Sequence, residues 1–313
     1  MMSKAVRFER YGGPEQLQVV EVDDRRPGPG EVRVAVVAAA INPGELSILA
    51  GDMHAMFPAD FPSGQGSDLA GVVAETGDGV DSVSVGDPVI GFSDWRSSQA
   101  EFVVLPADHV IPKPAGVGWL EAASLYVAGT TAVSAVRAVA PERGETVVVA
   151  GAAGGVGVLA AQLARNAGAT VVGTASEENH AALTDLGILP VAYGDGVLDR
   201  IRAAAPGGVD AFIDAHGSGN VALALELGVS PDRIDTIIDF AAAGEHGVKT
   251  QGMAAVDARQ ALTEIADAVD RGEVVVPVYA TYPLARVREA YERLADRHGF
   301  GKIVLEVGEA PAP

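Results

Sequence analysis

Residues 146–157 read Thr146-Val147-Val148-Val149-Ala150-Gly151-Ala152-Ala153-Gly154-Gly155-Val156-Gly157, an apolar, β-branched run that ends in a glycine cluster. Apolar residues at helical spacing continue to Ala164. This pattern predicts a buried strand, a tight turn and the first turns of a helix. Such a turn favours anions, because glycines admit a pyrophosphate and the helix start offers free N–H groups. We therefore expect a dinucleotide to bind here.

The glycine cluster departs from the usual Gly-x-Gly-x-x-Gly fingerprint, because Ala152 occupies the first glycine position ahead of Gly154 and Gly157. Its context strengthens the interpretation, since a second apolar run follows at residues 170–175, the spacing of a βαβ unit. A tight turn between strand and helix with no ligand is the alternative.

Length and charge restrict the kind of protein. A chain of 313 residues predicts two domains. The net charge of −20 argues against nucleic acid or an anionic membrane as partner, because both require basic surface. No apolar run of about 20 residues predicts a membrane-spanning helix, and residues 1–6 enter a strand pattern without a signal peptide. We expect a cytoplasmic protein.

The chain contains no cysteine, which excludes disulfides, a cysteine nucleophile and thiolate zinc sites. Its six histidines are scattered and form neither a His-x-His nor a His-Glu-x-x-His pair. Structural histidines are therefore expected, and no metal site.

The pattern of strands and helices changes along the chain. Residues 1–115 are rich in strand and turn signals, whereas strands alternate with helices after Trp119, which predicts a doubly wound parallel sheet. A final strand, helix and strand are expected at residues 274–278, 284–295 and 302–307, and this piece is a candidate to rejoin the N-terminal β-rich part.

Several short motifs in this order resemble the zinc-independent medium-chain dehydrogenase/reductases, in particular their quinone oxidoreductase-like branch. They extend over nearly the whole chain and are residues 11–15 (YGGPE), 29–32 (PGEV), 41–43 (INP), 66–73 (GSDLAGVV), 85–87 (VGD), 128–132 (AGTTA), 151–157 and 301–305 (GKIVL). In the zinc-containing branch a Gly-His-Glu motif carries a metal ligand, and the matching positions here are Gly66, Ser67 and Asp68.

The resemblance implies an α/β protein with two domains. A β-rich, GroES-like catalytic domain would comprise residues 1–124 and 272–313, and a Rossmann dinucleotide-binding domain residues 125–271, with the active site in the cleft between them. NADPH is the implied hydride donor, although NADH stays open. Quinones, enones and related α,β-unsaturated carbonyls are the implied substrates, and a homodimer is the implied assembly.

The resemblance also assigns cofactor contacts. Thr131 would lie near the nicotinamide, Thr174 and Ser176 around the adenosine ribose, and Lys302 would reach a 2′-phosphate, unless it is a surface lysine beside a strand. The pyrophosphate would bind Ala152, Ala153, Gly154, Gly155, Val156 and Gly157.

Asn42 and Tyr126 are the catalytic candidates. The Asn42 amide would face nicotinamide and substrate, unless it only caps a turn before Pro43. Tyr126 stands where proline is common in relatives and offers a phenol. Relatives often have a tyrosine where this chain has Ser47, so their proton donor is missing, which leaves water, Tyr126 or His216.

The cofactor-selecting segment gives opposing signals. Gly173 or Thr174 occupies the position of the carboxylate that binds the ribose of NAD, which favours NADPH. Glu177 or Glu178 replaces an arginine common in relatives, and a carboxylate facing a 2′-phosphate would repel it.

Two other functions compete with NADPH-dependent reduction of quinones or enones. One is an NADPH-binding structural or sensing protein with vestigial catalysis, which the loss of tyrosine at Ser47 motivates. The other is a zinc-dependent alcohol dehydrogenase, which the missing ligands disfavour.

Overall fold

The computed structural model describes residues 2–252 and 255–310. The chain divides into two compact units: unit 1 comprises residues 1–127, 278–298 and 302–313, and unit 2 comprises residues 128–277 and 299–301. The boundaries expected from the sequence, after residues 124 and 271, lie a few residues earlier. The mixed α/β class is confirmed, with a parallel sheet in unit 2 and a β-rich unit 1.

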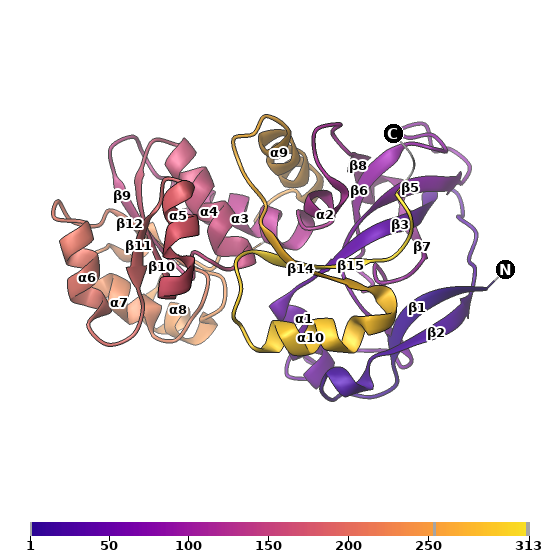
Figure 1. The fold of residues 1–313 in the computed structure, drawn as a ribbon, viewed down its shortest axis with the longest axis horizontal. Coiled ribbons are helices and arrows are strands. Elements are labelled where there is room, and N and C mark those ends of the chain that lie inside the picture. The colour runs from indigo at the N-terminus through magenta and orange to yellow at the C-terminus, as the bar shows by residue number, and fades with distance from the viewer. Residues whose placement is uncertain (1, 253–254, 311–313) are drawn as a thin grey trace. The chain divides into compact units, whose positions relative to one another are not determined.

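Two sheets form most of unit 1 (Figure 1). The larger has the order β14-β15-β3-β5-β6-β8, with β7 also paired to β3, and the smaller has the order β2-β1-β4. The strands are β1 (Met2–Phe8), β2 (Gln18–Asp23), β3 (Glu31–Ile41), β4 (Ser63–Gly64), β5 (Asp68–Thr76), β6 (Pro88–Phe92), β7 (Phe102–Pro106), β8 (Val110–Pro112), β14 (Val278–Pro283) and β15 (Lys302–Glu306).

Strand β3 is the centre of the larger sheet. It runs antiparallel to β15, where Ile41 faces Ile303, and antiparallel to β5, where Ala38 faces Ala70. The end of β3 therefore meets the starts of both neighbours. All residues of β3 except Glu31 and Arg33 are apolar and most of the strand is buried, as expected for a strand covered on both faces.

Three helices belong to unit 1: α1 (Pro43–Ala50), the short α2 (Trp119–Ala122) and α10 (Val287–Ala295). Helix α10 is amphipathic and buries Val287, Ala290 and Tyr291 in a core shared with Phe8 and Leu49. In Figure 1, α10 lies along α1 and beside β14 and β15, which agrees with its contacts. Residues far apart in sequence thus build one core.

Unit 2 is a doubly wound sheet with the order β11-β10-β9-β12-β13, in which every pair is parallel. Figure 1 shows α4 and α5 on one face of this sheet and α6 and α7 on the other. The strands are β9 (Thr146–Ala150), β10 (Thr170–Ala175), β11 (Leu189–Ala192), β12 (Ala211–Asp214) and β13 (Ile234–Thr236). The helices are α3 (Tyr126–Val139), which begins in unit 1, and α4 (Gly155–Asn166), α5 (His180–Asp185), α6 (Val197–Ala204), α7 (Asn220–Glu226), α8 (Phe240–His246) and α9 (Ala258–Asp270).

The prediction of a strand at residues 274–278 is wrong for residues 274–277, because β14 begins only at Val278. The backbone of Val275 is bonded to a side chain and not to a neighbouring strand. Its N–H donates to Oε1 of Gln162 and its carbonyl accepts from Nε2 of the same residue, both at 2.8 Å. An amide from α4 therefore satisfies the groups that a strand would use.

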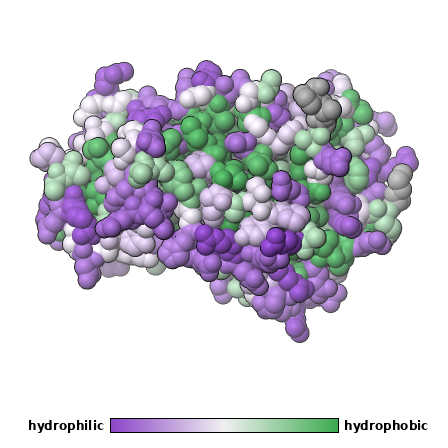
Figure 2. Space-filling model, viewed as in Figure 1, coloured by the Kyte–Doolittle hydropathy of each residue, from purple (hydrophilic) through white to green (hydrophobic). Residues whose placement is uncertain are grey.

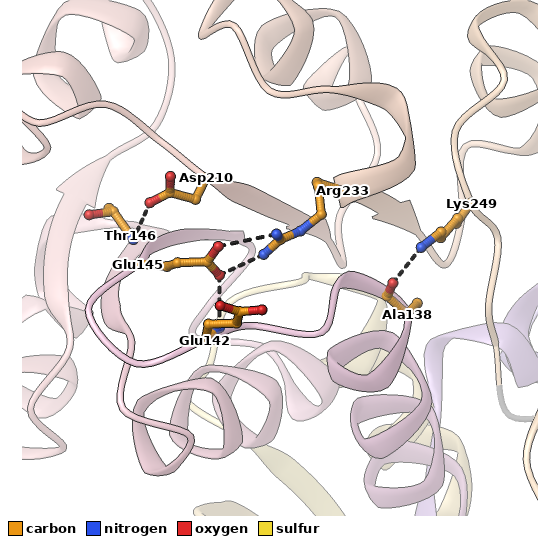
Figure 3. A network of polar contacts seen from close by, with 7 residues as sticks. All are labelled: Ala138, Glu142, Glu145, Thr146, Asp210, Arg233 and Lys249. Carbon is orange, nitrogen blue, oxygen red and sulfur yellow. Dashed lines mark hydrogen bonds and ion pairs between the residues drawn. The ribbon is translucent and has the colours of Figure 1, made fainter.

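Charged side chains close the edge of the unit 2 sheet where the strands begin (Figure 3). The Arg233 guanidinium donates to both oxygens of Glu145, at 3.1 and 2.6 Å. Glu145 also accepts from the Glu142 N–H, and Asp210 accepts from the Thr146 N–H. These bonds join the segment before β9 to those before β12 and β13.

Figure 2 shows hydrophilic residues over much of the visible face, interrupted by smaller apolar patches. Within residues 2–252 and 255–310, no helix is long and apolar enough to cross a bilayer.

We expect Arg233→Ala to lower the free energy of unfolding by about 1 kcal/mol, because a partly buried, bidentate ion pair is lost. Arg233 lowers the pKa of Glu145, so its stabilising effect is present at neutral pH and disappears as the pH falls through that pKa. Urea titrations at pH 7 and at pH 3 test this. The exposed pair Arg286–Glu289 provides the control, since Arg286→Ala should leave the midpoint unchanged.

Candidate functional site

The turn between β9 and α4 is held tightly by glycine. Gly151 has a φ of +75°, and a Cβ on Gly157 would lie 2.1 Å from the Gly151 carbonyl oxygen. Helix α4 can therefore start this close to the strand only with glycine at position 157, which is the packing role of the third glycine of a dinucleotide fingerprint.

Ala152, in the first glycine position, is accommodated by a glycine on the neighbouring strand. Ala152 is fully buried, and a Cβ on Gly173 of β10 would lie 2.7 Å from its methyl group. The space that the fingerprint usually frees at residue 152 is freed here at residue 173. The imperfect motif therefore encodes a complete turn.

Thr174 fastens the same turn from β10. Its hydroxyl oxygen accepts from the Gly151 N–H at 3.2 Å, and its carbonyl accepts from the Ala152 N–H at 3.0 Å. Beyond β10, the Ser176 hydroxyl donates to Glu178 at 3.1 Å and accepts from the Asn179 amide at 3.0 Å. A glutamate thus lies beside the residue expected to contact the ribose, and the ribose role of both residues stays a prediction.

Gly154 is the exposed position of the turn. It is the residue before α4, with a φ of −76°, and the nearest atom to a Cβ there would be the Gly151 oxygen at 3.3 Å. Gly155 and Val156 begin the helix, where the first N–H groups have no partner within it. Open backbone at the positive end of a helix dipole fits a pyrophosphate. Ala153 is buried in the turn, and Thr131 is buried in α3.

A second polar centre lies in unit 1, where β3 ends. Asn42 follows β3, Asp68 starts β5 and Lys302 starts β15, so the antiparallel pairing brings all three together. Asp68 has no exposed area, and Asn42 and Lys302 are each 5% exposed. A carboxyl group, an amine and the amide between them are thus buried together at one edge of the sheet.

The Asn42 amide has one orientation that fits its neighbours. Its Oδ1 accepts from Lys302 Nζ at 2.5 Å, and its Nδ2 donates to Asp68 at 2.5 Å and to Glu45 at 3.2 Å. Lysine only donates and an ionised carboxylate only accepts, so a flipped amide would lose all of these contacts. Both amide hydrogens have carboxylate acceptors.

Glu45 extends the cluster into α1 and α10. Its Oε2 accepts from the Asn42 backbone N–H at 3.2 Å and from the Tyr291 hydroxyl at 2.5 Å. The Gln99 amide donates to the same hydroxyl at 2.6 Å. Three buried oxygens have no hydrogen-bond partner among the described residues: Oε1 of Gln65, Oε1 of Gln99 and the Ser98 hydroxyl.

Burial dominates the electrostatics of this cluster. It raises the pKa of Glu45 to about 7, with the Tyr291 hydrogen bond opposing it. It also raises the pKa of Asp68, which Lys302 and Asn42 lower in turn. The pKa of Lys302 is lowered by burial, whereas Asp68 and Glu45 raise it. Such perturbed, interacting groups are typical of functional sites.

Tyr126 adjoins this cluster, because Asp68 accepts from the N–H of the next residue, Val127, at 2.8 Å, and the Tyr126 ring lies in a stack of rings. Its ring is 4.2 Å from that of Phe92 at an interplanar angle of 8°, and Phe92 is 4.2 Å from His109 on its other side. The hydroxyl is bonded to Asp94, and burial followed by the charge of Asp94 raises its pKa. The phenol is therefore neutral at physiological pH, and its catalytic role stays a prediction.

The structure decides between the alternatives left open for the positions of Lys302 and Asn42. The surface-lysine alternative for Lys302 is wrong, since the side chain is buried. Asn42 does stand at the N-terminus of α1, with Pro43 as its first residue. Glu45 was not among the residues predicted for the site, although Asn42-Pro43-Gly44-Glu45 has the spacing of a capping box. No local signal pointed to Tyr291.

Within residues 2–252 and 255–310, no three His, Cys, Asp or Glu side chains form a group able to hold a metal ion. Asp68, at the position that matches the zinc-binding motif, instead accepts from the Asn42 amide, whose oxygen accepts from Lys302.

Comparison with known proteins identifies the family. Residues 28–115 match the alcohol dehydrogenase GroES-like domain, and residues 190–305 match a model described as zinc-binding dehydrogenase. A quinone oxidoreductase of Rattus norvegicus is 30% identical, over 97% of this chain and 98% of that protein. A quinone oxidoreductase of Pseudomonas aeruginosa is 27% identical, over 97% and 99%. The solved quinone oxidoreductase of Coxiella burnetii has a TM-score of 0.87 and 28% identity, over 98% of this chain and 100% of that one.

The chain belongs to the quinone oxidoreductase-like medium-chain dehydrogenase/reductases. Members of this family use a nicotinamide cofactor, so the chain is an NAD(P)H oxidoreductase, and its substrate is a small molecule.

Gly157→Ala should lower the free energy of unfolding by about 1–3 kcal/mol, because the new methyl group collides with the Gly151 carbonyl. Gly154→Ala is the matched control and should cost less than Gly157→Ala, since its methyl group would lie 3.3 Å from the Gly151 carbonyl oxygen and not 2.1 Å. Thermal unfolding of both variants measures the difference. Equal destabilisation would contradict the packing role assigned to Gly157.

The buried Glu45 should make stability depend on pH. Burial raises its pKa to about 7 in the folded protein, against 4.5 for an exposed glutamate, so unfolding releases a proton between these values. The free energy of unfolding should therefore fall by about 3 kcal/mol as the pH rises from 4.5 to 7. Denaturant titrations should show this fall in the wild type and its loss in Glu45→Gln. Glu21→Gln, which changes an exposed carboxylate of β2, should behave as the wild type.

Proposed function

We propose that this protein transfers a hydride from NADPH to a quinone or to an α,β-unsaturated carbonyl, without zinc. The observation that carries the proposal is the turn between β9 and α4, where Gly154, which has no side chain, lies exposed at the start of the helix. That cradle fits a pyrophosphate, and family membership supports a nicotinamide cofactor. The bound cofactor supplies the hydride.

The residues of the turn have separate roles in this proposal. Gly157 and the Ala152–Gly173 contact fix the position of the helix start, and Gly154 leaves room for the pyrophosphate. The first N–H groups of α4, at Gly155 and Val156, donate to its oxygens. The turn binds and orients the cofactor without a charged side chain, which suits a protein whose net charge of −20 opposes anions.

The remaining cofactor contacts follow the family pattern. Thr131 lies near the nicotinamide, Thr174 and Ser176 surround the ribose, and Asn42 faces the nicotinamide and substrate. NADPH is proposed over NADH because Gly173 and Thr174 carry no carboxylate. Glu178, bonded to Ser176, opposes this preference if it faces a 2′-phosphate.

The proposal extends to a cytoplasmic homodimer that acts on small molecules. The family resemblance supports the dimer, and the acidic charge disfavours nucleic acid and anionic membranes as partners. Light scattering of the purified protein tests the assembly.

Fluorescence titration should show NADPH binding more tightly than NADH, and Gly154→Ala should weaken both while the protein stays folded. The wild type with NADPH should then reduce members of a panel of quinones and enones, which is followed at 340 nm. Tighter binding of NADH would contradict the choice of cofactor. Tight binding of NADPH with no turnover across the panel would favour the structural or sensing function.

A further inference from the structure

Lys302 is a buried cation with hydrogens to spare. Its ammonium carries three N–H groups, and Oδ1 of Asn42 accepts one of them at 2.5 Å. The other two have no acceptor among residues 2–252 and 255–310, although Lys302 is only 5% exposed. A buried donor left unpaired is costly, which points to an oxygen that arrives with a ligand.

Asn42 cannot donate a hydrogen bond to such a ligand oxygen in the arrangement observed. Its two amide hydrogens point to the carboxylates of Asp68 and Glu45, and its carbonyl is taken by Lys302. To donate to a substrate, the amide would have to give up a charged acceptor at 2.5 or 3.2 Å. The group beside it, Lys302, donates with no such loss.

The neighbours of Lys302 hold its charge in place. Asp68 on β5 and Glu45 on α1 both favour the ammonium form and counteract the lowering of its pKa by burial. Asn42, between Lys302 and both carboxylates, keeps the charges apart through its amide. The amine is therefore oriented by Asn42 and only partly used.

We propose that Lys302 Nζ donates hydrogen bonds to the substrate oxygen that becomes negative on reduction, and then gives it a proton. The inference rests on the proposed function and adds a catalytic residue to it. It also fills the position of proton donor left open by Ser47.

The proton balance of the step is simple. A hydride adds to a carbon of the enone or to the quinone, and the electron pair displaced from the carbonyl π-bond moves to oxygen. One N–H bond of Lys302 then breaks as the O–H bond forms, which leaves an enol or hydroquinone and a neutral amine. Water returns a proton to the amine. Lowering of the ammonium pKa by burial makes this transfer easier.

A negatively charged oxygen could also come from the 2′-phosphate of NADPH, the role first expected for Lys302. That group carries about two charges, as phosphate monoesters do near neutral pH. Asp68 and Glu45, both in the cluster, would repel a lasting dianion. A single charge that forms briefly and is removed by a proton suits the cluster better.

Lys302→Met tests the proposal. We expect kcat/KM for a quinone or enone to fall about 10²–10³-fold, as when one oxyanion donor is removed, while the dissociation constants of NADPH and NADH stay unchanged. Lys249→Met is the matched control, because Lys249 Nζ also donates to a single oxygen, that of Ala138, at 2.6 Å (Figure 3). It should keep full activity.

Two results would overturn the proposal. One is a folded Lys302→Met with wild-type kcat/KM. The other is a selective loss of NADPH affinity with NADH unaffected, which assigns Lys302 to the 2′-phosphate. If Lys302→Met does not fold, Lys302→Arg decides: its guanidinium keeps the charge and does not release a proton, so kcat should fall at least about tenfold, and an unchanged kcat contradicts proton donation.

A binding measurement separates this inference from the proposed function. The probe is 4-nitrophenol, whose phenolate imitates a hydroquinone anion and absorbs visibly. The wild type and Lys302→Arg should lower the pKa of the bound phenol, and Lys302→Met should not. If no quinone or enone is reduced but this difference is seen, only the proposed reaction fails. If Lys302→Met binds the phenolate as the wild type does, the role of Lys302 fails.

Discussion

The bond between Lys302 and Asn42 fixes the arrangement at the end of β3. Two carboxylates and an ammonium are buried together there, which costs free energy unless each charge finds partners. The amide of Asn42 supplies them, because it accepts from the cation on one side and donates to both carboxylates on the other. The ends of β3, β5 and β15 are thereby held in one register.

This arrangement also explains why unit 1 is discontinuous in sequence. Strand β15 lies between β14 and β3, so the larger sheet is complete only when the last strand has joined it. The polar end of β3 lacks its cation until then. The polar cluster thus connects segments from near the two ends of the chain.

Local patterns predicted the fold well where structure is local. The run at residues 146–157 gave β9, the turn and α4 nearly to the residue, because burial, glycine and helical spacing act over a few positions. The strand expected at residues 274–278 was wrong, since a valine-rich run says nothing of Gln162, which binds its backbone from more than 100 positions away.

The candidate site was predictable in part for the same reason. Asn42 was found through its proline motif, which is local, and Glu45 was within reach of a capping-box search. The bonds from Tyr291 and Lys302 span 246 and 260 positions, so only the sheet order and helix packing reveal them. The pKa shifts of Glu45 and Lys302 are caused mainly by burial, and a sequence motif does not predict burial of this kind.

The contact between Ala152 and Gly173 has a consequence for how the sequence can change over generations. A Cβ at residue 173 would lie 2.7 Å from the Ala152 methyl group and 2.9 Å from Ile188 Cγ2, so a side chain there requires that residue 152 become glycine and that Ile188 shift. The reverse order passes through an overpacked turn. In this chain the two residues are therefore bound to change as a pair.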